Sequence, residues 1–402
     1  MSSNWPTKTL AEVCQIRPPK AEARQRLAQA ELVSFVPMED MGIDQMVLVP
    51  TQTKPLAEVA GSYTYFADGD VLLPKITPCF ENGKLAIASE LTNGIGFGSS
   101  EFMVFRPDKS VDKGWLYYFL SRESFRVEGA ARMSGAVGHK RVAMEFIDSY
   151  PIPIPPLPEQ QRIVAILYEA FEGIATAKTN TEKNLQNARE VFESQLDWIF
   201  SNPGVGWVEK KLGEICNIAR GGSPRPIKAF LTDASNGVNW IKISDATASS
   251  KFIYSTAQKI KPSGVSRSRL VQDGDFILSN SMSFGRPYIM KTTGCIHDGW
   301  LVLSNYQSSF DPDFLYLLLG SKFIYRQFDQ LAAGSTVRNL NIDLASGVVV
   351  PIPPLKEQER LAEALGSFDE NVQQLSGIYQ QKLTALDELK QSLLHRAFNG
   401  DL

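Results

Sequence analysis

The sequence predicts an α+β fold, in which two duplicated globular domains with mixed β-sheets are joined by two long antiparallel helices that form a coiled coil. Two observations predict this architecture. The first is a proline-rich motif that occurs twice, half a chain apart, with further matches in the same order in each half. The second is a long stretch of apolar residues at helical spacing after each copy of the motif.

The internal repeat is clearest in the proline-rich motif. Residues 153–162 read Pro-Ile-Pro-Pro-Leu-Pro-Glu-Gln-Gln-Arg, and residues 351–360, 198 positions later, read Pro-Ile-Pro-Pro-Leu-Lys-Glu-Gln-Glu-Arg. Further matching segments are 5–16 with 207–218, 68–73 with 273–278, and 115–117 with 314–316. The repeat therefore predicts a first domain at 1–152, a first helical region at 153–203, a second domain at 204–350 and a second helical region at 351–402.

The first helical region begins after a proline-rich stop. Pro153, Pro155 and Pro156 cannot lie inside a helix, whereas Pro158 suits a first turn. Apolar residues then follow at helical spacing as far as an Asn-Pro-Gly sequence at 202–204, which is a stop signal. The second helical region repeats this pattern.

The second region predicts a helix from Lys356 to Phe398, and helices of this length must bury an apolar stripe. The duplication predicts that the two helices bury their stripes against each other as an antiparallel coiled coil. The alternative is two independent helices, each packed on its own globular domain. Gly173, Gly366 and Gly377 are positions where either helix could bend or break.

The two globular domains contain short β-rich stretches separated by Gly, Asp and Ser turns. One helix is expected in each domain, near residues 113–128 and 312–330. Residues 17–65 and 219–270 share little that aligns, which indicates either two modules that recognise different things or drift after duplication. The expected strands lie at residues 70–73, 102–105, 239–243, 276–278 and 301–303.

The charge of the chain is unevenly distributed. The 402 residues carry a net charge of −3, which is unfavourable for contact with phosphates. Residues 207–350, however, hold 16 Lys and Arg against 11 Asp and Glu. The acidic excess lies mostly in the two helical regions, so a local basic face on a globular domain remains compatible with nucleic-acid binding.

The four cysteines, Cys14, Cys79, Cys216 and Cys295, include no Cys-Xaa-Xaa-Cys pair, which favours a reduced protein without structural zinc. No apolar segment is long enough for a transmembrane helix, and the first residues lack the pattern of a signal peptide. We therefore expect a cytoplasmic protein with no membrane partner.

The paired proline-rich motifs, the half-length duplication and the long helix after each motif together resemble the specificity subunit of type I restriction–modification systems. The opening block at 207–218 and the Gly-Ser-Thr-Val-Arg-Asn sequence at 334–339 also fit. The resemblance covers essentially the whole chain. One departure is that residues 135–141 read Gly-Ala-Val-Gly-His-Lys-Arg and lack the Ser-Thr of the second copy.

The resemblance implies a target-recognition domain in each half, each reading one half of an asymmetric split site in double-stranded DNA. The helices set the spacer and dock two methyltransferase subunits, and restriction (translocase) subunits join the complex. S-adenosylmethionine, ATP and Mg are then expected on the partner subunits and no cofactor on this chain. The residues assigned to partner binding come from the two motifs: Glu159, Gln160, Arg162, Glu357, Gln358 and Arg360.

The residues themselves indicate no catalytic site. The chain has no Asn/Asp-Pro-Pro-aromatic motif of a DNA methyltransferase and no phosphate-binding Gly-Xaa4-Gly-Lys-Ser/Thr loop. His139, His297 and His395 are far apart in sequence, so a histidine-based metal cluster is not expected. The sequence therefore predicts a non-catalytic chain with no metal site.

Polar, glycine-punctuated loops with cations are the expected DNA contacts, because base edges need donors and acceptors while Lys, Arg, Ser and Thr grip phosphates. Lys140 and Arg338 occupy equivalent positions in the two halves. The alternative is that these are solvated surface loops. The candidates are Lys75, Thr77, Lys84, His139, Lys140 and Arg141 in the first half, and Ser223, Arg225, Lys228, Asn280, Ser281, Ser283, Phe284, Arg286, Ser335, Thr336, Arg338 and Asn339 in the second.

Two other functions remain open at this point. A protein-interaction scaffold with two heads on a coiled coil would suit the acidic pI of 5.8 and would bind its partners without a steep salt dependence. An enzyme of unrecognised type has no positive support in the sequence, and turnover by the chain alone would be its signature.

Overall fold

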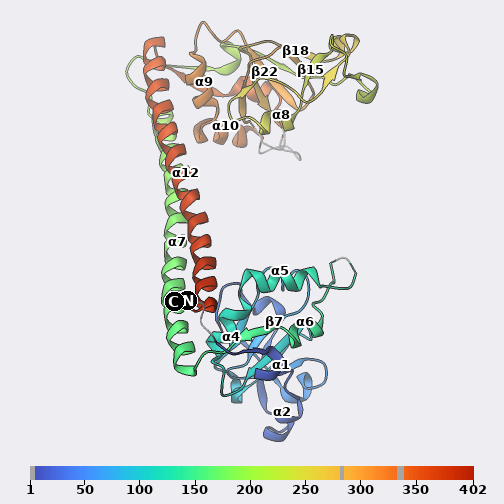
Figure 1. Ribbon diagram of the computed structural model, residues 1–402. Helices are drawn as coiled ribbons and strands as arrows, with labels where there is room; N and C mark the ends of the chain where they lie inside the picture. The colour runs from blue at the N-terminus through green and yellow to red at the C-terminus, as the bar shows by residue number, and fades with distance from the viewer. Residues whose placement is uncertain (1–4, 137, 281–284, 333–338) are drawn as a thin grey trace. The chain divides into compact units, whose positions relative to one another are not determined.

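The computed structural model describes residues 5–136, 138–280, 285–332 and 339–402. The chain forms two compact units, which Figure 1 shows in ribbon form. Unit 1 comprises Met1–Thr181 and Gln381–Leu402, and unit 2 comprises Glu182–Gln380. Each long helix therefore begins in one unit and ends in the other, whereas the sequence divided the chain into four consecutive segments.

The globular part of unit 1 contains eleven strands and six α-helices among the described residues. Its strands are β1 (Thr7–Thr9), β2 (Cys14–Ile16), β3 (Leu32–Val36), β4 (Val47–Leu48), β5 (Gln52–Pro55), β6 (Thr64–Ala67), β7 (Val71–Pro74), β8 (Ala86–Ala88), β9 (Ile95–Gly98), β10 (Phe102–Pro107) and β11 (Pro151–Pro153). Its helices are α1 (Leu10–Val13), α2 (Ala21–Arg26), α3 (Leu56–Val59), α4 (Lys113–Leu120), α5 (Glu123–Ala131) and α6 (Met144–Asp148), with 3-10 turns η1 (Met38–Asp40) and η2 (Thr92–Gly94).

The globular part of unit 2 follows the same plan. Its strands are β12 (Val208–Lys211), β13 (Asn217–Arg220), β14 (Leu231–Thr232), β15 (Val238–Ile241), β16 (Phe252–Ile253), β17 (Lys259–Ile260), β18 (Arg269–Val271), β19 (Phe276–Ser279), β20 (Pro287–Met290), β21 (Gly294–Ile296), β22 (Trp300–Ser304) and β23 (Val349–Ile352). Its helices are α8 (Ile243–Thr247), α9 (Pro312–Leu319), α10 (Lys322–Ala332) and α11 (Ile342–Gly347), with 3-10 turns η3 (Leu212–Glu214), η4 (Ile227–Ala229) and η5 (Pro262–Arg267).

The two units share one sheet topology. Unit 1 has a five-stranded sheet in the order β2-β10-β7-β8-β4 and unit 2 one in the order β13-β22-β19-β20-β16, and in each only the last pair is parallel. A second mixed sheet, β5-β3-β9-β6 in unit 1, corresponds to β17-β15-β21-β18 in unit 2, where β14 is added at the edge. The segments 17–65 and 219–270, which do not align in sequence, therefore build equivalent strands.

The central strands of the five-stranded sheets are apolar on both faces, which explains their continuous hydrophobic runs. In β7, Val71 and Leu73 pack into one core and Leu72 into another, because successive side chains point to opposite faces. In β19, Phe276 and Ile277 divide in the same way. Every strand expected from the sequence is present, and both domains are of the predicted α+β class.

The long helices are α7 (Leu157–Ser201) and α12 (Leu355–Asn399), and both run without a break at the three glycines. Within unit 1, Lys178 of α7 forms an ion pair with Asp387 of α12. Within unit 2, the rings of Phe192 and Phe368 lie 5.7 Å apart. Of these two contacts, the one that lies later in α7 lies earlier in α12, so the helices pack antiparallel as predicted.

Each core is completed by the end of the helix that began in the other unit. Phe398 of α12 packs against Trp115 in unit 1, with ring centroids 4.3 Å apart. Phe200 of α7 packs against Phe314 in unit 2, with ring centroids 5.6 Å apart. The alternative of two independent helices, each packed only on its own domain, is therefore wrong.

The single helix expected near 113–128, and its counterpart near 312–330, is in each case two helices. The Ser121 hydroxyl donates to the Tyr118 carbonyl at 2.8 Å, and Arg122 is extended, so α4 ends before α5 begins. The Ser321 hydroxyl likewise donates to the Leu318 carbonyl at 2.6 Å between α9 and α10. Serine competes here for the helix carbonyls that the next turn would use.

Among the described residues, no helix has both the length and the apolar character needed to cross a membrane.

Candidate nucleic-acid interface

Three segments meet where the inner strand β7 ends and the neighbouring strand β10 begins, in the five-stranded sheet of unit 1. They are the loop after β7, the β9–β10 turn at residues 99–101, and residues 134–136 and 138–141 before α6. The Lys75 amide donates to the Glu101 carbonyl at 2.9 Å, and the Val142 amide donates to the Lys75 carbonyl at 2.9 Å. The Thr77 amide donates to the Lys140 carbonyl at 3.0 Å. We call this meeting point junction 1.

Junction 1 is organised around the Glu101 carboxylate. Arg141 donates to it from Nε at 2.9 Å and from Nη2 at 2.7 Å, and these bonds hold the pKa of Glu101 below its usual value. Lys75 Nζ donates to the Ser100 carbonyl at 2.9 Å and lies 4.0 Å from Glu101, while partial burial lowers the pKa of Lys75. His139 and Lys140 are exposed beside this cluster.

Unit 2 builds the same junction from the end of β19, the β21–β22 turn at residues 297–299, and the segment that precedes α11. The Asn280 amide donates to the Gly299 carbonyl at 3.0 Å, and the Leu340 amide donates to the Asn280 carbonyl at 2.9 Å. These bonds match those of Lys75 in unit 1. We call this meeting point junction 2, and it contains Asn280 and Asn339 from the candidate set.

Side chains repeat the correspondence between the two junctions. Asn280 Nδ2 donates to the Asp298 carbonyl at 2.7 Å, as Lys75 Nζ does to the Ser100 carbonyl. His297 Nδ1 accepts from the Gly299 amide at 2.9 Å, as Ser99 Oγ accepts from the Glu101 amide at 3.2 Å. The two turns are therefore equivalent position by position although their residues differ.

Junction 2 also gathers the loop after β13. Ser223 Oγ donates to Asp298 Oδ1 at 2.5 Å, and this bond lowers the pKa of Asp298. Arg225 Nη2 lies 3.7 Å from Asp298 Oδ2, and Arg220 Nε donates to the Asp298 carbonyl at 3.1 Å. Lys228 follows this loop and is exposed. Ser223, Arg225 and Asn280, which are far apart in sequence, are thus brought together by one acidic residue.

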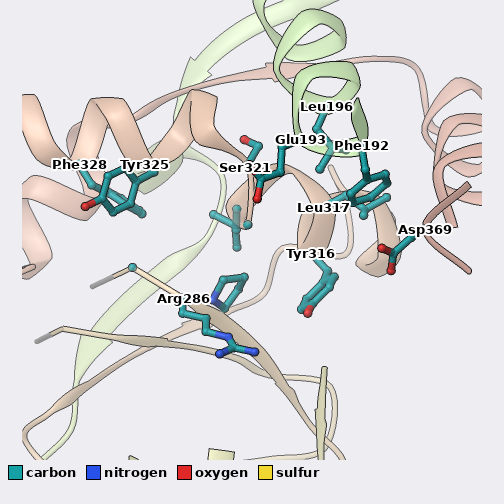
Figure 2. A pocket seen from close by; sticks show the side chains of 14 residues that line it. Phe192, Glu193, Leu196, Arg286, Tyr316, Leu317, Ser321, Tyr325, Phe328 and Asp369 are labelled. Carbon is teal, nitrogen blue, oxygen red and sulfur yellow. The ribbon is translucent and has the colours of Figure 1, made fainter. Parts of the chain in front are cut away.

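Two candidates lie apart from the junctions. Lys84 Nζ donates to the Met38 carbonyl at 3.0 Å. Arg286 lies over the Tyr288 ring, 5.2 Å from its centroid, and lines a hollow of about 510 Å³ on the helical side of unit 2. Figure 2 shows Phe192 and Leu196 of α7 across this hollow from Arg286. Ser281, Ser283, Phe284, Ser335, Thr336 and Arg338 lie outside the described residues.

The two motif glutamines assigned to partner binding are fully buried. Gln160 Oε1 accepts from the Asp112 amide at 2.8 Å, and its Nε2 donates to the carbonyls of Ser110 and Pro155 at 2.8 Å each. Gln358 makes the same three bonds in unit 2. It accepts from the Asp311 amide and donates to the carbonyls of Ser309 and Pro353. Both glutamines therefore hold the fold of their own unit, and their assignment to partner binding stays a prediction.

In both copies the motif arginine is exposed and the paired motif glutamate is partly exposed. Arg162 pairs with Glu159 at 2.7 Å, and Arg360 pairs with Glu357 at 2.7 Å, each in the first turns of its helix. Hydrogen bonds between the partners lower the pKa of both glutamates. These four side chains remain available to a partner, and their assigned role stays a prediction.

Sequence reasoning missed the acids that organise the junctions, because it searched for cations and hydroxyls that could meet phosphate. Glu101 stands one residue before Phe102 and Asp298 two residues before Trp300, at the start of equivalent strands. An acid at nearly the same distance before a repeated strand is a signal that could have revealed them. Arg220, just before the glycines of its loop, was missed as well.

The family model for the type I restriction modification DNA specificity domain matches residues 2–186 and 204–383, once in each half of the chain. The chain belongs to this family. The two matches follow the internal duplication and together include both junctions.

The specificity-domain chain is similar to curated relatives. It is 36% identical over 165 residues to the type I restriction enzyme EcoAI specificity subunit of Escherichia coli, and 39% identical over 166 residues to the EcoEI specificity subunit of the same species. Each alignment covers 41% of this chain and 27% of the relative, so the chain spans about a quarter of these relatives' length. It is 23% identical to the MjaVIII specificity subunit of Methanocaldococcus jannaschii over 73% of this chain and 71% of that protein.

Two solved structures share the fold. A chain from a structure of a type I R-M system, studied for complex assembly and conformational transition, superposes with a TM-score of 0.82 at 20% identity and covers all of both chains. The HsdS subunit from Thermoanaerobacter tengcongensis superposes with a TM-score of 0.66 at 21% identity, covering 100% of this chain and 98% of that one. At these identities the likeness supports the specificity-subunit fold.

Proposed function

We propose that this chain is the non-catalytic DNA-recognition subunit of a type I restriction–modification complex. Each globular unit reads one half of an asymmetric split target in double-stranded DNA, and α7 and α12 set the spacer between the halves. Methyltransferase subunits dock on the helices and restriction subunits complete the complex. S-adenosylmethionine, ATP and Mg are then required by those partners.

The observation that supports this proposal most directly is the repeated junction. In each unit, the same backbone bonds hold three loops together at the end of an inner strand, and those loops carry exposed or part-exposed cations, amides and hydroxyls. Such groups can contact both phosphates and base edges. A rigid frame that carries different side chains is the arrangement expected of two readers of different sequences.

The chemistry of the two junctions supports an asymmetric target. Junction 1 presents His139, Lys140 and a paired Arg141, whereas junction 2 presents Ser223 and Arg225 beside Asp298, whose backbone carbonyl accepts from the buried Asn280. Donor and acceptor patterns that differ select different base pairs, because each base pair has its own pattern in the major groove.

The distribution of charge supports DNA contact at the second domain and not along the helices. Residues 207–350 carry the excess of Lys and Arg, while the helices carry the acidic excess. The relatives' description as specificity subunits of restriction enzymes supports methyltransferase and restriction partners. Glu159, Arg162, Glu357 and Arg360 are the exposed or partly exposed motif residues that we propose for these contacts.

The test is reconstitution with the methyltransferase subunit of the same system, followed by single-molecule mapping of methylated bases. The expected result is methylation at a split motif with two unlike halves. Exchange of residues 1–152 for those of another family member should change one half and leave the other. Methylation without sequence preference, or none that depends on this chain, contradicts the proposal. A salt-independent complex without DNA affinity would favour a protein-interaction scaffold.

A further inference from the structure

The acidic residues in the β9–β10 and β21–β22 turns differ in position and in what they bind. In unit 1 the acid is Glu101, and both of its oxygens are occupied by the fork of Arg141. In unit 2 the acid is Asp298, one position earlier, where unit 1 has Ser100. Both Glu101 oxygens accept from Arg141, whereas Asp298 Oδ2 lies 3.7 Å from Arg225, beyond direct hydrogen-bond distance, and can accept from a ligand.

Asp298 is held in a fixed orientation. Its backbone carbonyl accepts from Asn280 Nδ2 at 2.7 Å and from Arg220 Nε at 3.1 Å. Ser223 occupies Oδ1, which leaves Oδ2 facing Arg225 at 3.7 Å, longer than a direct hydrogen bond. The Asp298 side chain is 48% exposed and that of Arg225 83% exposed. An oriented carboxylate oxygen and a guanidinium therefore stand side by side at the surface.

The His297 side chain stabilises the turn that carries Asp298. Its Nδ1 accepts from the Gly299 amide, so the ring carries its proton on Nε2 and is neutral in this arrangement. Burial lowers the pKa of His297, which favours the same neutral form. His297 and Asp298 border an open hollow of about 770 Å³ together with Arg225, Trp240 and Lys242. Access to Arg225 and Asp298 is thus from an open surface flanked by cations.

A carboxylate beside a guanidinium matches the major-groove edge of one base pair. Guanine offers two acceptors, O6 and N7, to an arginine fork, and its partner cytosine offers the N4 donor to a carboxylate. An A·T pair places its N6 donor between the two acceptors N7 and O4, so the fork loses its paired acceptors. The order of groups in junction 2 thus favours G·C.

We propose that Arg225 and Asp298 together read one G·C base pair in the half-site of unit 2, Arg225 donating to guanine and Asp298 accepting from cytosine N4. This inference rests on the proposed function. His297, Ser223 and Asn280 are positioning residues, because they orient Asp298 and the turn that carries it.

The test uses the reconstituted complex with intact chains and maps the methylated motif of each variant. Asp298→Asn replaces the free acceptor by an amide, and Arg225→Lys removes the paired donors while keeping the charge. Each variant should reduce the preference for G·C at one position of one half-site by about tenfold, and both should act on the same position. The other half-site should not change.

Matched controls separate base reading from charge and from folding. Asp273→Asn removes a more exposed acid of unit 2 that pairs loosely with Lys291 at 3.9 Å, and it should leave the motif unchanged. Arg225 is largely exposed, so its variant tests the idea even if Asp298→Asn folds poorly.

The outcomes distinguish this inference from the proposed function. A sequence-specific wild-type complex whose motif survives both Arg225→Lys and Asp298→Asn overturns the reading pair and leaves the proposed function intact. Effects at two different base pairs also overturn it. A wild-type complex that methylates without sequence preference removes the proposed function itself, and the reading pair with it.

Discussion

Gln160 and Gln358 show how one side chain connects a motif to a fold. Each is fully buried, accepts from the amide of an aspartate that caps a helix, and donates to two carbonyls. The caps are Asp112 for α4 and Asp311 for α9. The glutamine in each proline-rich motif therefore joins the start of a long helix to the globular domain before it.

We expect Gln160→Ala to reduce the free energy of unfolding by about 2–3 kcal/mol, because it leaves one amide and two carbonyls without partners. Denaturant unfolding followed by circular dichroism measures this loss. Gln161→Ala, at the adjacent exposed position, is the control and should change stability by less than about 0.5 kcal/mol. Equal effects of the two variants would contradict the structural role of Gln160.

The cysteines provide a second check at this scale. Burial raises the pKa of Cys14 and of Cys216 to about 12, and Cys295 is also buried. Cys79 is partly exposed. Because the thiolate is the reactive form, N-ethylmaleimide at pH 8 should modify Cys79 first in the folded protein and all four cysteines after denaturation. Mass spectrometry of the adducts decides this, and early labelling of Cys14 or Cys216 would speak against the packing.

At the scale of the element, the long helices are continuous where glycine would permit a break. Gly173, Gly366 and Gly377 all lie inside α7 or α12, and a Cβ added at any of them meets nothing within 4 Å. The helices persist because their ends pack into both cores, and this packing outweighs the low helix propensity of glycine.

Replacing each of these three glycines by alanine should stabilise the protein by about 0.5–1 kcal/mol per site, since alanine loses less backbone entropy in a helix. The thermal midpoint of unfolding should therefore rise. Gly114→Ala is the matched helical control with the opposite sign, because its Cβ would lie 2.7 Å from Val164 Cγ1. A fall in the midpoint for the long-helix variants would show that those glycines serve another purpose.

At the scale of the whole molecule, the proposed function makes helix length a determinant of DNA spacing. The variant lacks seven residues from each helix, 182–188 of α7 and 375–381 of α12. Both segments lie between the contacts Lys178–Asp387 and Phe192–Phe368. Seven residues are about two turns, which preserves the buried faces, and they shorten a helix by about 10 Å.

The shortened protein should methylate the same two half-sites with a spacer about three base pairs shorter, given a rise of about 3.4 Å per base pair. Methylation mapping of the reconstituted complex measures the spacer directly. Deletion in α7 alone is the control, because it misaligns the antiparallel pair and should lower stability. An unchanged spacer in the double deletion would contradict the role of the helices as a ruler.

The sequence by itself determined the repeat, the fold class and the long helices. Prolines, apolar spacing and terminal glycine or asparagine are local signals, and they placed the helix boundaries within a residue or two of Leu157–Ser201 and Leu355–Asn399. The strands predicted at 70–73, 102–105, 239–243, 276–278 and 301–303 are present, because buried β-branched and aromatic runs carry their own pattern, but most of the shorter strands were not predicted.

Only the tertiary structure decided which loops meet and which polar residues are buried. Asp298, Ser223 and Asn280 come together because β13, β19 and β22 pair across long sequence separations, and no local pattern records such pairing. Gln160 and Arg162 stand two positions apart in one motif, yet one is fully buried and the other exposed. Their environments depend on the neighbouring domain, whose position local sequence does not encode.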